Sequence, residues 1–92
     1  MQVVQTPTFS KAVKKLHANQ KKDLDKAVRA VMDNPGIGDA KRGDLAGVFV
    51  HKFKMVGQLT LLAYTWQGQT LTLTLLALGT HENFYRDLKK SS

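Results

Sequence analysis

The sequence contains no cysteine, few acidic residues and no long apolar run. The absence of cysteine excludes disulfide bonds, thiolate zinc sites and a cysteine nucleophile, and it fits a reducing compartment. The longest apolar-rich stretch, from Leu59 to Leu78, is interrupted by threonine, glutamine and glycine and cannot span a bilayer. The opening residues 1–5 are too short and lack the charge of a signal peptide. We therefore expect a cytoplasmic protein.

Positive charge is what the composition has in excess. Fourteen Lys and Arg residues against seven Asp and Glu give a formal net charge of +7. This imbalance favours association with phosphates or with an acidic protein, although a solvated basic surface is the simpler alternative. An apolar fraction of 42% is ordinary for a folded protein. At this length we expect one domain, residues 1–92, with a thin core.

The first third of the chain has the period of two helices. Val3-Val4 is a candidate opening strand, Thr6 is a candidate N-cap, and Pro7 suits the first helical position. A break at His17-Ala18-Asn19 separates the helices, and Asn34-Pro35-Gly36 ends the second. Apolar residues recur at helical spacing at Phe9, Val13 and Leu16, and then at Leu24, Ala27, Val28, Val31 and Met32.

After a glycine-dotted segment, Ile37 to Gly47, that we interpret as a loop, the period changes to two. Three strands are predicted, Val48 to Met55, Leu59 to Trp66 and Thr70 to Leu78. Turns at Gly57-Gln58 and Gln67-Gly68-Gln69 make antiparallel hairpins of them. In the third strand, alternation puts Leu71, Leu73, Leu75 and Ala77 on one face and Thr70, Thr72 and Thr74 on the other.

This order of elements predicts an α+β fold. An N-terminal helical hairpin packs on a small, mainly antiparallel sheet, and a short C-terminal helix follows from His81 to Lys90. The hairpin should cover the apolar face of the sheet and leave the other face partly open.

The most informative stretch is Leu78-Gly79-Thr80-His81-Glu82-Asn83-Phe84-Tyr85-Arg86, where an apolar strand ends and a polar helix is expected to begin. Thr80 as N-cap would put His81 in the first helical turn, where the helix dipole and nearby cations disfavour a protonated imidazole. A neutral imidazole is a competent general base. The alternative is a solvated histidine at a helix start.

Side chains that follow His81 could help it to bind a nucleic acid. Tyr85 lies one helical turn after His81 and could stack on an unpaired base, although Phe84 and Tyr85 could instead anchor the helix to the sheet. Arg86 could hold a phosphate or pair with Glu82.

The strand segment His51-Lys52-Phe53-Lys54 is the second candidate. Alternation puts Lys52 and Lys54 on one face, where they could hold an anion or guard a strand edge. His51 shares the other face with two phenylalanines, which favours a core-edge histidine. The histidines are far apart and no carboxylate cluster accompanies them, so no metal site is expected. Cleavage of RNA needs no metal or cofactor, because its own 2′-hydroxyl can attack the adjacent phosphate.

These motifs together resemble the RelE/ParE superfamily of toxins from bacterial type II toxin–antitoxin modules, over nearly the whole chain. The helical hairpin, the basic loop, the strand Val48–Lys54, the strand ending in Leu61–Tyr64 and the closing Gly79-Thr80-His81 fall in family order. The resemblance implies a microbial-ribonuclease-like fold. One branch of the family cuts mRNA in the ribosomal A site, and another inhibits DNA gyrase with no known nuclease activity.

The resemblance also implies roles for particular residues. Lys52 and Lys54 match the lysine pair that contacts RNA phosphates in the nuclease branch. His81 follows Gly-Thr as the catalytic histidine does in the Gly-Thr-His branch, whereas RelE itself has an arginine there. Tyr85 matches an aromatic residue that positions the substrate.

The chain departs from the nuclease branch on the middle strand, where an arginine is expected near Thr60 or Leu61 and is absent. Lys41, Arg42 and Arg86 are the candidates to replace its charge and to bind RNA. The favoured hypothesis is a toxin that acts as a ribosome-dependent mRNA endoribonuclease and arrests translation. Its partners would be mRNA, rRNA and a cognate antitoxin. The alternatives are an inhibitor of DNA gyrase and a plain nucleic-acid-binding module.

Overall fold

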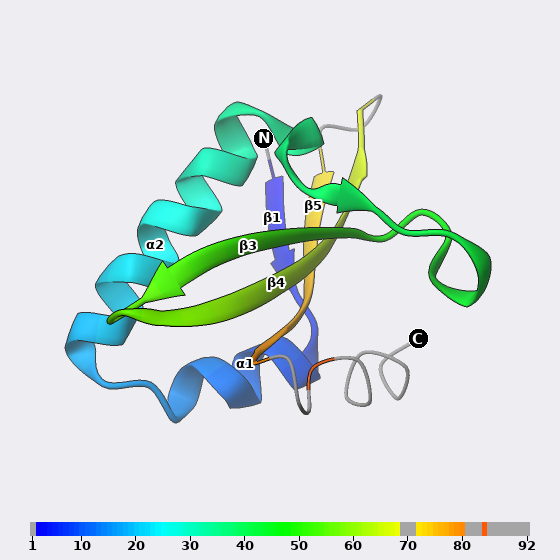
Figure 1. Ribbon diagram of the computed structural model, residues 1–92. Helices are drawn as coiled ribbons and strands as arrows, with labels where there is room; N and C mark the ends of the chain where they lie inside the picture. The colour runs from blue at the N-terminus through cyan, green and yellow to red at the C-terminus, as the bar shows by residue number, and fades with distance from the viewer. Residues whose placement is uncertain (1, 69–71, 81–83, 85–92) are drawn as a thin grey trace.

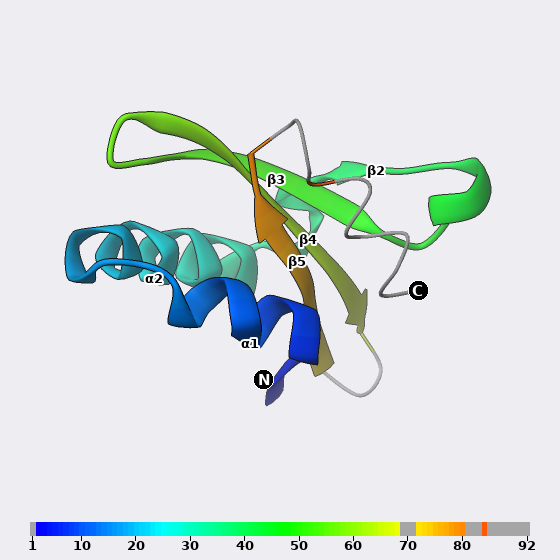
Figure 2. The same ribbon diagram turned by 90° about the horizontal axis from the view of Figure 1, so that it is seen from below.

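A computed structural model describes residues 2–68, 72–80 and 84, and in this part of the chain two helices lie on one face of a five-stranded sheet (Figure 1 and Figure 2). The strand order is β1-β5-β4-β3-β2; β1 runs parallel to β5, and all other neighbours are antiparallel. The predicted α+β fold is confirmed. The elements are β1 (Gln2–Gln5), α1 (Pro7–Lys14), α2 (Ala18–Asp33), η1 (Pro35–Ile37), β2 (Asp39–Ala40), η2 (Gly43–Leu45), β3 (Phe49–Met55), β4 (Gln58–Gln67) and β5 (Thr72–Gly79).

The start of α1 is fixed by Thr6. Its hydroxyl accepts a hydrogen bond from the Phe9 N–H at 3.2 Å and donates to the Leu76 carbonyl of β5 at 2.8 Å. Pro7 occupies the first turn, where its missing N–H leaves no helical bond unmade. The predicted cap therefore also attaches the helix to the sheet. Neither of the described helices is long and apolar enough to cross a membrane.

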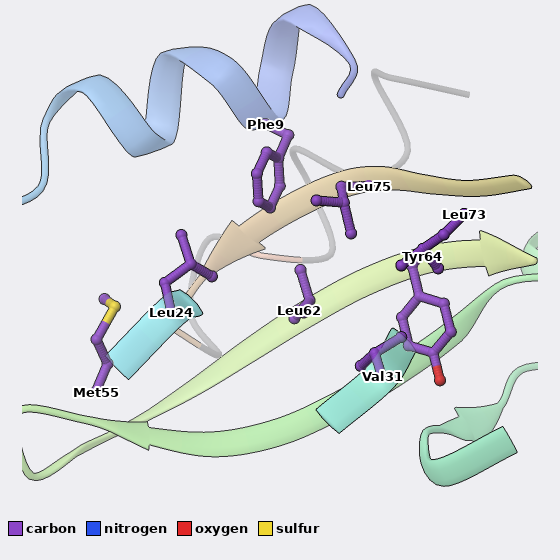
Figure 3. Packing of buried hydrophobic residues seen from close by; sticks show 8 residues of the cluster. All are labelled: Phe9, Leu24, Val31, Met55, Leu62, Tyr64, Leu73 and Leu75. Carbon is purple, nitrogen blue, oxygen red and sulfur yellow. The ribbon is translucent and has the colours of Figure 1, made fainter. Parts of the chain in front are cut away.

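The main core lies between the two helices and the sheet (Figure 3). The helices contribute Phe9, Leu24 and Val31, at the apolar positions that helical periodicity predicted. These side chains meet inward-facing residues of β3, β4 and β5. Burial of this apolar surface is the main stabilising term of such a small fold. The residues from the strands are Met55, Leu62, Tyr64, Leu73 and Leu75.

Tyr64 attaches the segment after α2 to this core. Its hydroxyl donates to the Pro35 carbonyl at 2.5 Å and accepts from the Gly38 N–H at 3.0 Å. Burial raises the pKa of this phenol, and the hydrogen bond from Gly38 opposes the shift. One donated and one accepted hydrogen bond at the same buried hydroxyl fix the path of the chain from α2 to β2.

The region 37–47, which periodicity predicted to be a loop, is more regular than expected. It contains β2, which pairs with β3 through Asp39–Val50 and Ala40–Phe49, and the 3₁₀ turn η2. β2 has only two residues, too few for an alternating pattern to be visible in the sequence.

The face of the sheet opposite the helices, here called the second face, carries its own apolar cluster. This face is therefore less open than expected. The cluster includes Phe84, which is 1% exposed. The expectation that Phe84 or Tyr85 anchors the C-terminal segment to the sheet is therefore fulfilled by Phe84. Its other buried members are Val48, Val50, Leu61, Ala63 and Ala77.

The predicted alternation in β5 is wrong at Ala77. Ala63 pairs with Ala77 and Tyr64 with Leu75, so Leu76 is an extra residue in β5. Such a β-bulge reverses the side of every later residue. Leu75 therefore faces the helices, whereas Ala77 belongs to the second cluster. The expected strand residues 70 and 71 lie outside the described part of the chain.

The turn between β3 and β4 is displaced by one residue from its predicted place. Met55 pairs with Gln58, which leaves Val56 and Gly57 as a two-residue loop. Both have positive φ, 51° for Val56 and 79° for Gly57. This combination is typical of a type I′ turn, which favours Asn-Gly. A β-branched residue at positive φ is strained.

We expect Gly38→Ala to destabilise the fold by about 1–3 kcal/mol, because overpacking a tight contact has costs of this order. An added Cβ would lie 2.8 Å from the Tyr64 phenolic oxygen. Gly36→Ala is the matched control, since its Cβ would lie an ordinary 3.6 Å from the Asn34 side chain. Urea unfolding of both variants would test this. Equal stability of the two variants would contradict a close fit at Gly38.

We expect Val56→Asn to stabilise the protein by about 1 kcal/mol, because asparagine tolerates positive φ better than a β-branched residue does. Val56 is 51% exposed, so the change removes little packing. Val56→Thr, which keeps the branched Cβ, is the control and should give no comparable gain. The measurement is the midpoint of chemical unfolding, and a destabilised Val56→Asn variant would refute the argument.

Candidate nucleic-acid interface

Lys52 and Lys54 lie on the second face of the sheet, and both are exposed. Lys52 pairs with Leu61, and Leu61 pairs with Gly79, so these three residues form one row across β3, β4 and β5. Neighbouring strands are about 4.8 Å apart, so the backbone of Lys52 lies about 10 Å from that of Gly79. The lysine pair and the end of β5 thus border the same part of the sheet.

Thr80 and Phe84 are the two residues after Gly79 that the structure describes. The Phe84 N–H donates to the Thr80 carbonyl at 3.1 Å, a bond of α-helical spacing, and Phe84 itself is buried in the second cluster. His81, Tyr85 and Arg86 lie outside the described residues, as does the rest of the predicted helix, 81–90.

Lys41 and Arg42 lie at the opposite end of β3. The Lys41 N–H donates to the Val48 carbonyl at 2.9 Å, and Arg42 is exposed directly before η2. Lys52 lies four residues after Val48, which corresponds to about 13 Å at the rise of an extended strand. The fold therefore does not bring Lys41 and Arg42 next to the lysine pair.

The middle strand presents no polar group between the lysines and β5. Leu61 is 1% exposed and belongs to the second cluster. Thr60 is equally buried, and its hydroxyl donates to the Gln58 carbonyl at 3.1 Å. The positions where the nuclease branch carries an arginine are thus filled by an apolar core residue and an internally bonded threonine.

His51 faces the helices, as its alternation with Lys52 predicted. Its ring stacks on Phe53 with centroids 6.0 Å apart and an interplanar angle of 12°. Burial lowers the pKa of His51 below its ordinary value of 6.5, because the charged imidazolium loses hydration. This histidine is a core-edge residue, remote from the lysine face.

The described residues form no enclosed pocket, and no three of their histidine or carboxylate side chains are grouped as metal ligands. Exposed lysines beside an apolar sheet surface suit a phosphate backbone, because phosphate contacts need charge more than enclosure.

Sequence comparison identifies the family. A model of the ParE-like toxin of type II bacterial toxin–antitoxin systems matches residues 3–89. The chain belongs to this family. The superfamily suggested by its motifs is therefore confirmed, and the chain is a type II toxin by family. Comparison with curated protein sequences gives no significant match.

Solved structures of RelE toxins share the fold. A free E. coli RelE variant with two arginines replaced by alanine gives a TM-score of 0.73 at 16% identity, covering 98% of this chain and 90% of that one. The toxin–antitoxin complex RelBE of E. coli gives a TM-score of 0.70 at 18% sequence identity, and the match covers 88% of this chain and 96% of that chain. The toxin–antitoxin complex RelBE2 of Mycobacterium tuberculosis gives a TM-score of 0.67 at 21% identity, and the match covers 87% of this chain and 96% of that chain.

Sequence reasoning missed one contact that shapes this toxin's surface. The Asp23 carboxylate of α2 accepts a hydrogen bond from the Val56 N–H at 2.7 Å, across the tip of the β3–β4 hairpin. No local pattern links residues so distant in sequence. In the sequence, the contact is indicated only by the acidic residue Asp23 beside the apolar positions of the second helix.

We expect His51 to make folding stability pH-dependent. Since its pKa is lowered in the folded state, the unfolded chain binds the proton more readily, and stability falls as pH drops below 6.5. Urea midpoints at about pH 7.5 and about pH 5.5 should differ less for His51→Gln than for the parent. His17→Gln, which changes an exposed histidine, is the control. An unchanged pH dependence in His51→Gln would contradict this account.

Proposed function

We propose that this toxin is a metal-independent endoribonuclease that cuts mRNA on the ribosome and so arrests translation. The observation that carries the proposal is the exposed pair Lys52 and Lys54 beside the end of β5, from which the chain continues as Gly79-Thr80-His81. The two candidate phosphate-binding lysines therefore border the strand end from which the chain leads to His81, the candidate proton-transfer group.

The chemistry follows from RNA itself. A base removes the proton from a 2′-hydroxyl, whose oxygen forms a bond to the adjacent phosphorus while the bond to the 5′-oxygen breaks. An acid returns a proton to that leaving oxygen, and the products are a 2′,3′-cyclic phosphate and a 5′-hydroxyl. His81 is the proposed general base or acid. Lys52 and Lys54 would stabilise the additional negative charge on the phosphorane.

The remaining roles are those of substrate binding. Tyr85 would stack on a base and so orient the 2′-hydroxyl for in-line attack. Arg86 would hold a phosphate near the reacting group. Lys41 and Arg42, at the far end of β3, are better suited to more distant backbone or rRNA contacts than to replacing the missing arginine beside Leu61.

The proposal includes a protein partner. The solved structures that share this fold include toxin–antitoxin complexes from E. coli and M. tuberculosis. We expect a cognate antitoxin whose acidic segment covers the basic surface, because opposite charge accelerates association and a covered surface cannot bind RNA.

The alternative function is inhibition of DNA gyrase without nuclease activity. Two observations favour it: the matching family model is described as ParE-like, and the buried Leu61 and Thr60 stand where the nuclease branch carries an arginine. In that case toxicity would depend on a protein–protein contact, and His81 would be dispensable.

We expect His81→Ala to abolish toxicity and mRNA cleavage, because removing a general acid–base group typically lowers a rate by about 10²–10⁴-fold. The measurement follows protein synthesis and maps new mRNA 5′ ends within minutes of induction. Rapid translation arrest with in-frame mRNA ends, lost in the variant, is the expected result.

His17→Ala is the matched control for this experiment: His17 is the exposed N-cap residue of α2, so its replacement can weaken the helix start but should leave toxicity and mRNA cleavage unchanged. All proteins must be compared at equal abundance. Continued translation with a DNA-damage response, unchanged by His81→Ala, would instead support gyrase inhibition.

A further inference from the structure

Leu59 is an exposed leucine on the second face of the sheet, beside the lysine pair. It lies two residues before Leu61 in β4 with no register shift between them, so both side chains point to the same face. Leu61 is 1% exposed, whereas Leu59 is 53% exposed. This face is turned away from both helices (Figure 2). Leu59 therefore keeps much of its apolar surface in contact with water.

The strand register fixes the place of Leu59 relative to both lysines. Lys54 pairs directly with Leu59, and such cross-strand neighbours have Cβ atoms about 5 Å apart. Lys52 pairs with Leu61, so it is the diagonal neighbour of Leu59, at about 7–8 Å. Both lysines are exposed. One apolar side chain and two ammonium groups therefore share a small area of open sheet.

Two ordinary explanations of the exposed leucine need no ligand. Single apolar side chains are common on the surfaces of folded proteins. The aliphatic stem of Lys54 could also rest on Leu59 while its ammonium group stays in water. In both cases Leu59 would contribute to folding stability at most, and its polarity would have no effect on the cleavage of RNA.

A nucleotide combines the same two chemistries as this area of the sheet. Its phosphate is an anion, and its base has a flat face that gains free energy when it is removed from water. The lysines alone would hold the phosphates of any sequence, because phosphate contacts carry no information about the base. An apolar side chain beside them provides a surface against which an unpaired base can lie.

We propose that Leu59 is a base-contacting residue of the RNA site: one unpaired base lies against its side chain while Lys52 and Lys54 hold the neighbouring phosphates. The inference rests on the proposed function and adds a contact to the base, which the lysines do not provide. It also gives the site a means of selecting nucleotides. A purine buries more apolar surface than a pyrimidine, so cleavage should be faster where the contacted base is a purine.

The test measures single-turnover cleavage on purified ribosomes programmed with short mRNAs. One mRNA is intact, and the others carry an abasic nucleotide, with ribose and phosphate kept, at each position of the A-site codon in turn. Leu59→Ser removes the apolar contact, and Leu59→Met keeps it. Ile37→Ser is the matched control, because Ile37 is another exposed apolar residue, 44% exposed, in η1. Lys54→Gln shows the effect of losing a phosphate contact.

We expect Leu59→Ser to cut the intact mRNA about tenfold more slowly than the parent, the order of effect of one lost apolar contact. Leu59→Met and Ile37→Ser should cut it at nearly the parent rate. On the mRNA that lacks the contacted base, Leu59→Ser and the parent should cut at the same reduced rate, because the contact is already absent. Lys54→Gln should slow the cleavage of every mRNA, since its loss does not depend on the base.

Two results would overturn the inference alone. Equal rates for Leu59→Ser and the parent on intact mRNA would leave Leu59 as an ordinary surface residue or a contact for a protein partner. A loss that persists unchanged on every abasic mRNA would mean that the leucine does not act through a base. A parent that cuts no ribosome-bound mRNA would instead contradict the proposed function itself, so the two failures are distinguishable.

Discussion

The middle of the central strand β4 is buried on both faces of the sheet, and the rest of the structure depends on this constraint. Four consecutive residues, Leu61 to Tyr64, are each at most 1% exposed. Because successive side chains of a strand point to opposite faces, a run of consecutive buried residues needs a cover on each side of the sheet. The helices cover one face, and the buried Phe84 covers part of the other.

This double burial explains the bulge in β5. The extra residue, Leu76, allows Leu75 to face the helical core while Ala77 faces the second cluster. A regular strand would have put both residues on one side. The Leu76 carbonyl also accepts the Thr6 hydroxyl, so the irregular position in β5 is tied to the start of α1. The one extra residue in β5 thus allows the strand to contribute side chains to the clusters on both faces of the sheet.

The same arrangement separates the exposed basic residues into two groups. The second cluster occupies the middle of the outer face, so the exposed lysines of β3 remain at the hairpin end and Lys41 with Arg42 at the other. Burial of Leu61 also leaves the row between Lys52 and Gly79 apolar. In the proposed function, the cations that bind phosphate are therefore Lys52 and Lys54 of β3 together with Arg86 of the C-terminal sequence, whereas the nuclease branch also carries an arginine on the middle strand.

The sequence by itself determined the presence of two helices, the antiparallel strands and the family, although α2 begins at Ala18, within the break predicted at residues 17–19. Helical spacing from Phe9 to Met32 and strict alternation in β3 are local signals, and the Thr6-Pro7 start was read correctly for the same reason. Lys52 and Lys54 were rightly assigned to one face, because period two fixes sides within a strand. The motif order from Val48–Lys54 to Gly79-Thr80-His81 identified the superfamily that the family comparison confirmed.

Only the tertiary structure decided the side of Ala77, the second core under Phe84 and the contact of Asp23 with Val56. The same holds for β2, whose two residues are ordered by β3 and by the hydrogen bonds of Tyr64 to the segment before it. Each of these features joins residues far apart in the chain. Their energy comes from packing between layers, which local periodicity does not encode.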